Sequence, residues 1–189
     1  MKDFIKHIIS ERSNFINIVL NYKDIKDIEG SVLKSLQLKN TFQLNDRLDG
    51  VSFFKKFSRK VSGVIAIEKL LNIKFIDWHK INPVTYQPII NFEGEKIEVI
   101  TFDMQTFPKI AKNNKIPNIF VMQVDKRKFS VCGFASTAIL NKYQDINFMD
   151  DYLAKNTTAF YGFKYLIKVT NINDFKILMN SKTNENESS

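Results

Sequence analysis

The sequence is poor in the residues that build disulfides and soft metal sites. Among its 189 residues there are one cysteine, Cys132, and two histidines, His7 and His79. A single cysteine excludes an intramolecular disulfide, and this set argues against a zinc site built from cysteine and histidine. A bound metal would be held by oxygen, which suits Mg²⁺ or Mn²⁺. Cys132 falls inside a predicted strand, so we interpret it as a core thiol.

Clustered glycines and long apolar runs are also absent. The six glycines are scattered singly, so there is no glycine-rich phosphate loop. No apolar run approaches the roughly 20 residues that span a bilayer. Lys6 and His7 interrupt the apolar start of the chain, which therefore has no signal-peptide core. We expect a cytoplasmic protein, intracellular rather than secreted, with no membrane partner.

Positive charge is in excess. The formal net charge is +8 and the sequence pI is about 9.4. Such an excess favours polyanionic partners, DNA above all, although it also serves solubility alone. Two clusters are candidates for phosphate contacts, one before and within a predicted helix and one in a predicted turn: Lys55, Lys56, Arg59 and Lys60, then Lys126, Arg127 and Lys128. Tyr161 and Phe163, near Lys164, are weaker candidates for stacking on bases.

Residue patterns predict an α/β (α+β) fold with a central mixed sheet flanked by helices. The expected helices cover residues 3–20, 24–36, 52–71 (with a start at 52 or 58), 106–115, 136–143 and 173–179, and residues 148–155 form a short helix or loop. The expected strands form a hairpin over 85–102 around Gly94, a pair over 119–124 and 129–133, and a last strand over 165–169. We divide the chain into an N-terminal helical cap (1–50), a core (51–180) and a disordered polar tail (181–189).

Two acidic side chains occupy positions that are costly unless something compensates them. Glu98 shares a strand face with Ile100 and Phe102, since alternate strand residues point the same way. Glu68 falls on the apolar stripe of the helix over 52–71. A carboxylate among apolar neighbours needs a metal, a cation or hydrogen bonds. For Glu68 a solvated position at the edge of the stripe stays an alternative.

Three short motifs occur in a recognisable order. They are Gly63-Val-Ile-Ala-Ile-Glu68, then Tyr86-Gln87, then Ile97-Glu-Val-Ile-Thr101. This order resembles the PD-(D/E)XK nuclease superfamily over roughly residues 52–170. The resemblance implies a restriction-endonuclease-like fold. It also implies an active site in which strand and helix acids hold Mg²⁺ and a lysine stabilises charge.

The chain departs from that pattern at two central places. Glu98 matches the strand carboxylate and Glu68 the helix carboxylate, so these two would be the metal ligands. Gln87 stands where the family has an acid, and Ile100 stands where it has the lysine. Lys109 and Lys112 are candidates for a relocated lysine, and Asp77 or Asp103 for the lost acid.

Three functions stay open from the sequence. The favoured one is a DNA-associated protein of nuclease-like fold that binds or scaffolds without cutting, alone, as a homodimer or as a subunit of a larger assembly. The second is an active Mg²⁺-dependent endonuclease, a hydrolase with a relocated lysine. The third is a structural or accessory protein whose basic surface meets an acidic protein partner.

Overall fold

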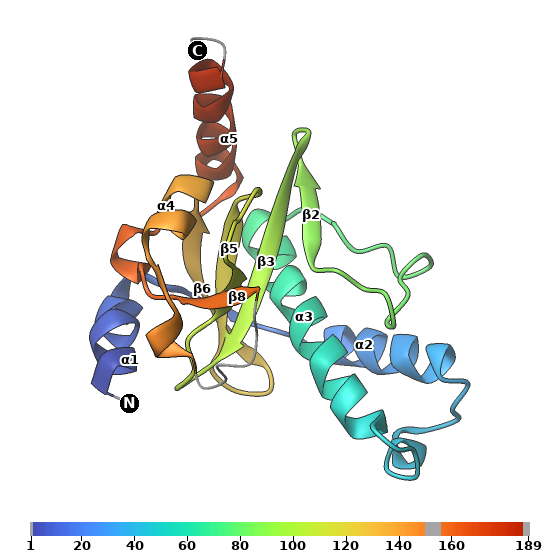
Figure 1. Ribbon diagram of the computed structural model, residues 1–189. Helices are drawn as coiled ribbons and strands as arrows, with labels where there is room; N and C mark the ends of the chain where they lie inside the picture. Colours follow the sequence, from blue (N-terminus) through green and yellow to red (C-terminus); the bar gives the residue numbers. More distant parts are fainter. Residues whose placement is uncertain (1, 150–155, 187–189) are drawn as a thin grey trace.

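The computed structural model describes residues 2–149 and 156–186, which form a mixed α/β fold with two sheets (Figure 1). The main sheet has the strand order β1-β6-β5-β3-β2, and within it only β3 and β5 run parallel. Its strands are β1 (Ile16–Val19), β2 (Ile89–Phe92), β3 (Glu95–Asp103), β5 (Asn118–Gln123) and β6 (Lys128–Ala135). The small antiparallel sheet has the order β4-β8-β7, from β4 (Lys109–Ala111), β7 (Gln144–Asp145) and β8 (Thr157–Phe160).

The predicted central hairpin is confirmed, with a shorter first strand. Its turn places Glu93 and Gly94 at positive φ, 49° and 88°, as a two-residue hairpin loop requires. β2 begins at Ile89, directly after Pro88, and Ile89 lies opposite Glu98. β3 continues to Asp103, so residues 100–103 of β3 extend past the start of β2.

Helix α3 (Gly50–Leu71) covers one face of the main sheet, and α2 (Tyr22–Ser35) packs beside it (Figure 1). Buried side chains of α3 such as Val61 and Ile65 join those of the central strands in one core. Gly63 permits the close approach, because a Cβ at this position would overlap the side chain of Thr101 on β3.

The opposite face of the main sheet carries a second, aromatic core. It is covered by α1 (Lys2–His7), the 3₁₀ segment Ile9–Asn14, the small sheet and α4 (Thr137–Lys142). Phe120 from β5 stacks on Phe160 from β8 with ring centroids 4.5 Å apart, which ties the two sheets together.

The last helix, α5 (Ile172–Asn186), projects from the body at the top of Figure 1. The Asn171 side chain accepts the N–H groups of Asn173 and Asp174, so Asn171 caps the start of α5. α5 continues into the predicted tail, of which residues 187–189 lie outside the described ranges.

Three predicted elements are wrong. The helix over 3–20 ends at His7, and its last part is β1, which pairs with β6. The helix over 106–115 is replaced by the short strand β4, and the strand over 165–169 by a 3₁₀ turn (Phe163–Tyr165) and a single bridge between Ile167 and Phe134. In each case a partner distant in sequence decided the conformation.

Other predictions in these regions are only partly tested. The segment 148–155 begins in a 3₁₀ turn (Ile146–Phe148), and its residues 150–155 lie outside the described ranges. The division of the chain at residue 50 stays a prediction. None of the described helices is both long and apolar enough to cross a bilayer.

Candidate functional site

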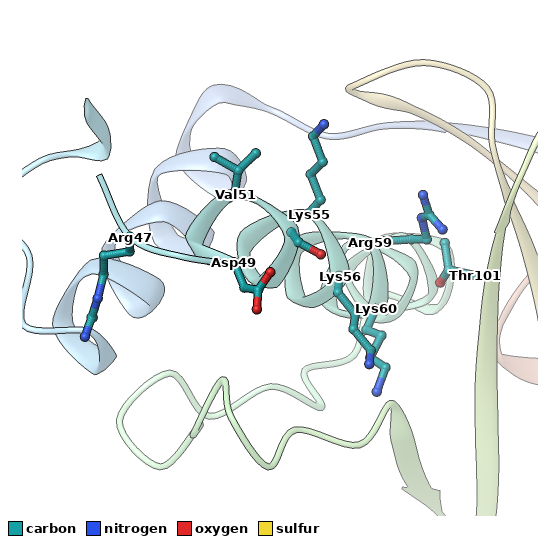
Figure 2. A pocket seen from close by; sticks show the side chains of 9 residues that line it. Arg47, Asp49, Val51, Lys55, Lys56, Arg59, Lys60 and Thr101 are labelled. Atoms are coloured by element: carbon teal, nitrogen blue, oxygen red, sulfur yellow. The ribbon is translucent and has the colours of Figure 1, made fainter. Parts of the chain in front are cut away.

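A basic hollow lies along the first half of α3. Its volume is about 730 Å³, and it is lined by Arg47, Asp49, Val51, Ser52, Lys55, Lys56, Arg59, Lys60 and Thr101. Figure 2 shows the basic side chains projecting from successive turns of the helix, with Arg47 on the preceding loop. Five cations and one carboxylate, that of Asp49, therefore line the hollow.

The charges on α3 repel one another. Lys55 and Arg59, like Lys56 and Lys60, are four residues apart, a spacing that places side chains together on a helix surface. Burial lowers the pKa of Lys60, and the neighbouring Lys56 lowers it further, while Glu98 acts in the opposite direction. The hollow is thus a concentrated positive surface.

A second groove adjoins the hollow, because Arg59, Lys60 and Thr101 line both. Its volume is about 470 Å³. It lies where β3 extends past β2, between α3 and the start of the small sheet. The remaining residues that line it are Gln87, Pro88, Glu98, Val99, Ile100, Phe102, Asp103, Thr106, Phe107, Pro108, Lys109, Phe148 and Met149.

Glu98 is the half-buried carboxylate of this groove. The parallel register places it opposite Asn118 of β5, whose amide donates to Glu98 Oε2 at 3.4 Å. Burial raises the pKa of Glu98, and the hydrogen bond from Asn118 and the charge of Lys60 lower it. Asn118 is fully buried, and its Oδ1 has no hydrogen-bond partner among the described residues.

Glu68 has a different position and different partners. It is 3% exposed, and its Oε1 accepts the backbone N–H groups of Phe75 and Ile76 at 2.6 and 2.7 Å. Lys74 Nζ lies 3.2 Å from Oε2. The helix glutamate therefore anchors the segment that follows α3, and it does not line the groove that contains Glu98.

The acids of the groove do not fit the metal site that the resemblance implies. Besides Glu98 the groove contains Asp103, which forms an ion pair with Arg59. Within residues 2–149 and 156–186, no three His, Cys, Asp or Glu side chains are grouped so that they could hold a metal ion. Mg²⁺ as a cofactor stays a prediction without a matching donor set.

The remaining sequence candidates divide between the groove and other surfaces. Gln87, Ile100 and Lys109 line the groove together with Glu98. Lys112 does not line it, and Asp77 lines a separate hollow beside Lys80. Neither Lys109 nor Lys112 is on a helix, since Lys109 begins β4 and the Lys112 backbone bonds to Asn156.

The second basic cluster lies at the turn between β5 and β6. Arg127 is partly used for structure, because its Nε donates to the backbone oxygen of Leu20 at 2.9 Å. Asp103 lies opposite Gln123, near the end of β5. Lys126 in the turn and Lys128 at the start of β6 are therefore at the same end of the sheet as the Arg59–Asp103 pair, although they line neither hollow.

Sequence reasoning missed two contributions to the site. Arg47 lies in a polar segment without periodicity, so no sequence pattern singled it out. The aromatic side chains Phe107 and Phe148 gave no signal, because 17 phenylalanines make any single one unremarkable. Of the aromatic residues that were predicted to stack, Phe163 is buried in the core, and Tyr161 packs against Phe148 with ring centroids 5.4 Å apart.

Comparisons with protein-family models, curated proteins and solved structures find no match to this chain. The resemblance to PD-(D/E)XK nucleases thus depends on the motifs alone and stays a prediction.

Proposed function

We propose that this protein binds the phosphate backbone of nucleic acid along α3 and does not cleave it. The observation that carries the proposal is the continuous concave surface formed by the basic hollow and the adjoining groove. Phosphates bound there would meet cations from the preceding loop, from α3 and from the start of β4: Arg47, Lys55, Lys56, Arg59, Lys60 and Lys109.

The cost of this surface supports the proposal. Like charges four residues apart destabilise a helix by roughly 0.2–0.5 kcal/mol per pair. In the described ranges, Lys55 and Lys56 form no ion pair that would offset this cost, and Lys60 has only its electrostatic interaction with Glu98. Phosphate groups would supply the missing negative charge and release counterions on binding.

The groove supports binding over cleavage. Ile100 can neither donate a hydrogen bond nor carry charge, and Gln87 is a neutral, poorer ligand for a hard cation. Glu68 is occupied by backbone N–H groups outside the groove. We infer a PD-(D/E)XK-like core in which the catalytic set is incomplete. Its support is the succession of α3, the β2–β3 hairpin and β5 parallel to β3.

Binding to a labelled duplex DNA, measured by fluorescence anisotropy at about 50 and 200 mM salt, tests the proposal. We expect binding that weakens steeply with salt. Replacing both Lys56 and Lys60 by alanine should lower the log–log salt slope by about 1.8, at about 0.9 per lost phosphate contact. The control pair Lys164→Ala with Lys168→Ala removes the same charge from exposed positions outside both hollows.

Two outcomes would contradict the proposal. Absence of binding at low salt would favour an acidic protein partner for the basic surface. An equal loss in both double variants would show that only net charge matters, and not the surface along α3.

One observation favours the second candidate, a Mg²⁺-dependent endonuclease. Lys60, on α3, interacts electrostatically with Glu98. A cation therefore does lie near the strand carboxylate, but it comes from α3 and not from the segment 106–115 that the sequence suggested. A plasmid-nicking assay with Mg²⁺ and with Mn²⁺ decides between the candidates. Metal-dependent nicking by the unmodified protein that is abolished in Glu98→Ala would show cleavage and would contradict the proposal of binding alone.

A further inference from the structure

The groove beside Glu98 combines two chemically different sets of side chains. Arg59, Lys60 and Lys109 supply positive charge. Phe107 and Phe148 supply aromatic surface, and their rings stack with centroids 4.9 Å apart and an interplanar angle of 24°. Cations next to aromatic rings are the combination that binds single-stranded nucleic acid, through the backbone and through the bases.

Neighbouring aromatic side chains pack against both rings. His7 lies 5.6 Å and Tyr161 5.4 Å from the Phe148 ring, and Phe4 lies 5.8 Å from the Phe107 ring, all between centroids. Both phenylalanines nevertheless stay half-buried and line the groove, whereas Phe102 beside them is buried. A rigid, partly open aromatic surface loses little conformational entropy when a ligand stacks on it.

Polar groups lie in the same groove. The Gln87 amide offers a donor and an acceptor. Base edges carry donors and acceptors of the same kind. The volume of about 470 Å³ is within the range of pockets that take small organic ligands, the size class of one nucleotide.

We propose that this groove accepts an unpaired nucleotide, with its base on the aromatic side at Phe107 and Phe148 and its phosphates on the side of Arg59, Lys60 and Lys109. Bases in a duplex are already stacked on their neighbours, so the groove selects single-stranded DNA or RNA over duplex. This inference rests on the proposed function, because the adjoining basic hollow would hold the flanking backbone.

Three labelled probes with equal numbers of phosphates test the inference by fluorescence anisotropy: a single strand of about 12 nucleotides, the same strand with abasic sites, and a blunt hairpin duplex. We expect the single strand to bind about ten-fold more tightly than the other two. Phe148→Leu keeps an apolar side chain and should reduce the single strand to the affinity of the abasic strand. Phe148→Tyr keeps the ring and should restore binding.

Tyr165→Leu is the matched control, because Tyr165 stacks on Tyr143 at 4.1 Å and does not line the groove. It should change the affinity by less than about two-fold. If Phe148→Leu does not fold, as judged by circular dichroism, the comparison of the three probes on the unmodified protein decides.

The outcomes separate this inference from the function on which it rests. Equal, salt-dependent binding of all three probes, weakened in the Lys56/Lys60 double variant, would overturn the nucleotide site and leave backbone binding intact. If Phe148→Leu binds the single strand as tightly as the unmodified protein does, the nucleotide site is likewise overturned and backbone binding stays intact. Absence of binding to every probe at low salt would overturn both.

Discussion

Lys60 on α3 and Glu98 on β3 line the same groove, and each shifts the pKa of the other toward its charged form. Burial opposes both effects, since it lowers the pKa of Lys60 and raises that of Glu98. The groove thus contains a cation and an anion that are both incompletely compensated. This situation has measurable consequences for pH dependence and for the affinity for polyanions.

Glu98→Gln should stabilise the protein at neutral pH. Burial raises the pKa of Glu98, so the folded state takes up a proton at a higher pH than the unfolded state does. The contribution of Glu98 to stability therefore falls as pH rises through that raised pKa. Urea unfolding at about pH 4 and about pH 7.5 should show that the advantage of the variant is larger at the higher pH. An equal gain in stability at both pH values would contradict a raised pKa of Glu98 in the folded state.

The same substitution should increase affinity for nucleic acid. A negative charge in the groove repels phosphate, and Glu98→Gln removes it while keeping an acceptor for Asn118. We expect about two- to five-fold tighter binding at low salt, with the gain reduced at high salt by screening. Weaker binding by the variant would mean that the Glu98 carboxylate itself contacts the nucleic acid, either through a metal ion that it ligates or as a hydrogen-bond acceptor for a base.

Asp103→Asn should release Arg59 for the ligand. The two side chains form a half-exposed ion pair at the groove, and such pairs contribute about 0–1 kcal/mol to stability. The variant should lose little stability and bind nucleic acid about two- to three-fold more tightly. Asp3→Asn, at an exposed position of α1, makes the same charge change outside both hollows and controls for net charge. Equal gains in the two variants would contradict a local role of Asp103.

Glu68→Ala should destabilise the protein strongly. It leaves the N–H groups of Phe75 and Ile76 without their acceptor, at a cost of about 3 kcal/mol. Lys74→Ala removes only the ion pair between the exposed Lys74 side chain and Glu68, and should cost less than about 1 kcal/mol of stability. Unfolding in urea measures both. A loss below about 1 kcal/mol in Glu68→Ala, together with stabilisation of the unmodified protein by Mg²⁺, would instead support the metal-ligand role implied by the resemblance.

Gly63→Ala should also be destabilising, by about 1–3 kcal/mol, because the new methyl group overlaps Thr101 across the α3–β3 contact. Gly30→Ala on α2 is the matched control, since a Cβ there has no neighbour within 4 Å. Alanine is the better helix former, so the control should gain about 0.5–1 kcal/mol. Thermal unfolding of the two variants should therefore shift in opposite directions.

The sequence predicts the elements whose pattern is long or whose turn is specific. α3 follows from its extended apolar stripe, and the β2–β3 hairpin from the two runs around Gly94. β1 and β4 were not predictable in this way. β1 has four residues and β4 has three, and each pairs with a strand far along the chain. Pro108, a residue type that is common in the first turn of a helix, stands instead just before β4.

The candidate site was predictable only in part. Strand alternation predicts one face for Glu98, Ile100 and Phe102, and Ile100 and Phe102 do pack in the same aromatic core. Glu68 is buried, which is one of the two positions that the sequence leaves open. The partners of Glu68 are backbone groups of a segment without a pattern, so its separation from Glu98 could not be predicted. The presence of Phe148 in the groove likewise depends on tertiary packing, since it follows β7 of the small sheet.

The late start of β2 at Ile89 has one more consequence. In the described ranges no strand pairs with residues 100–103 of β3 on the β2 side, so this part of the backbone is a template on which another chain could add a strand. Charged side chains are a common protection of such edges. Here Arg59 and Lys60 stand beside it, so two copies that met edge to edge would bring their cations together. The side chains proposed to attract phosphate would thereby also keep this protein from aggregating through its own sheet.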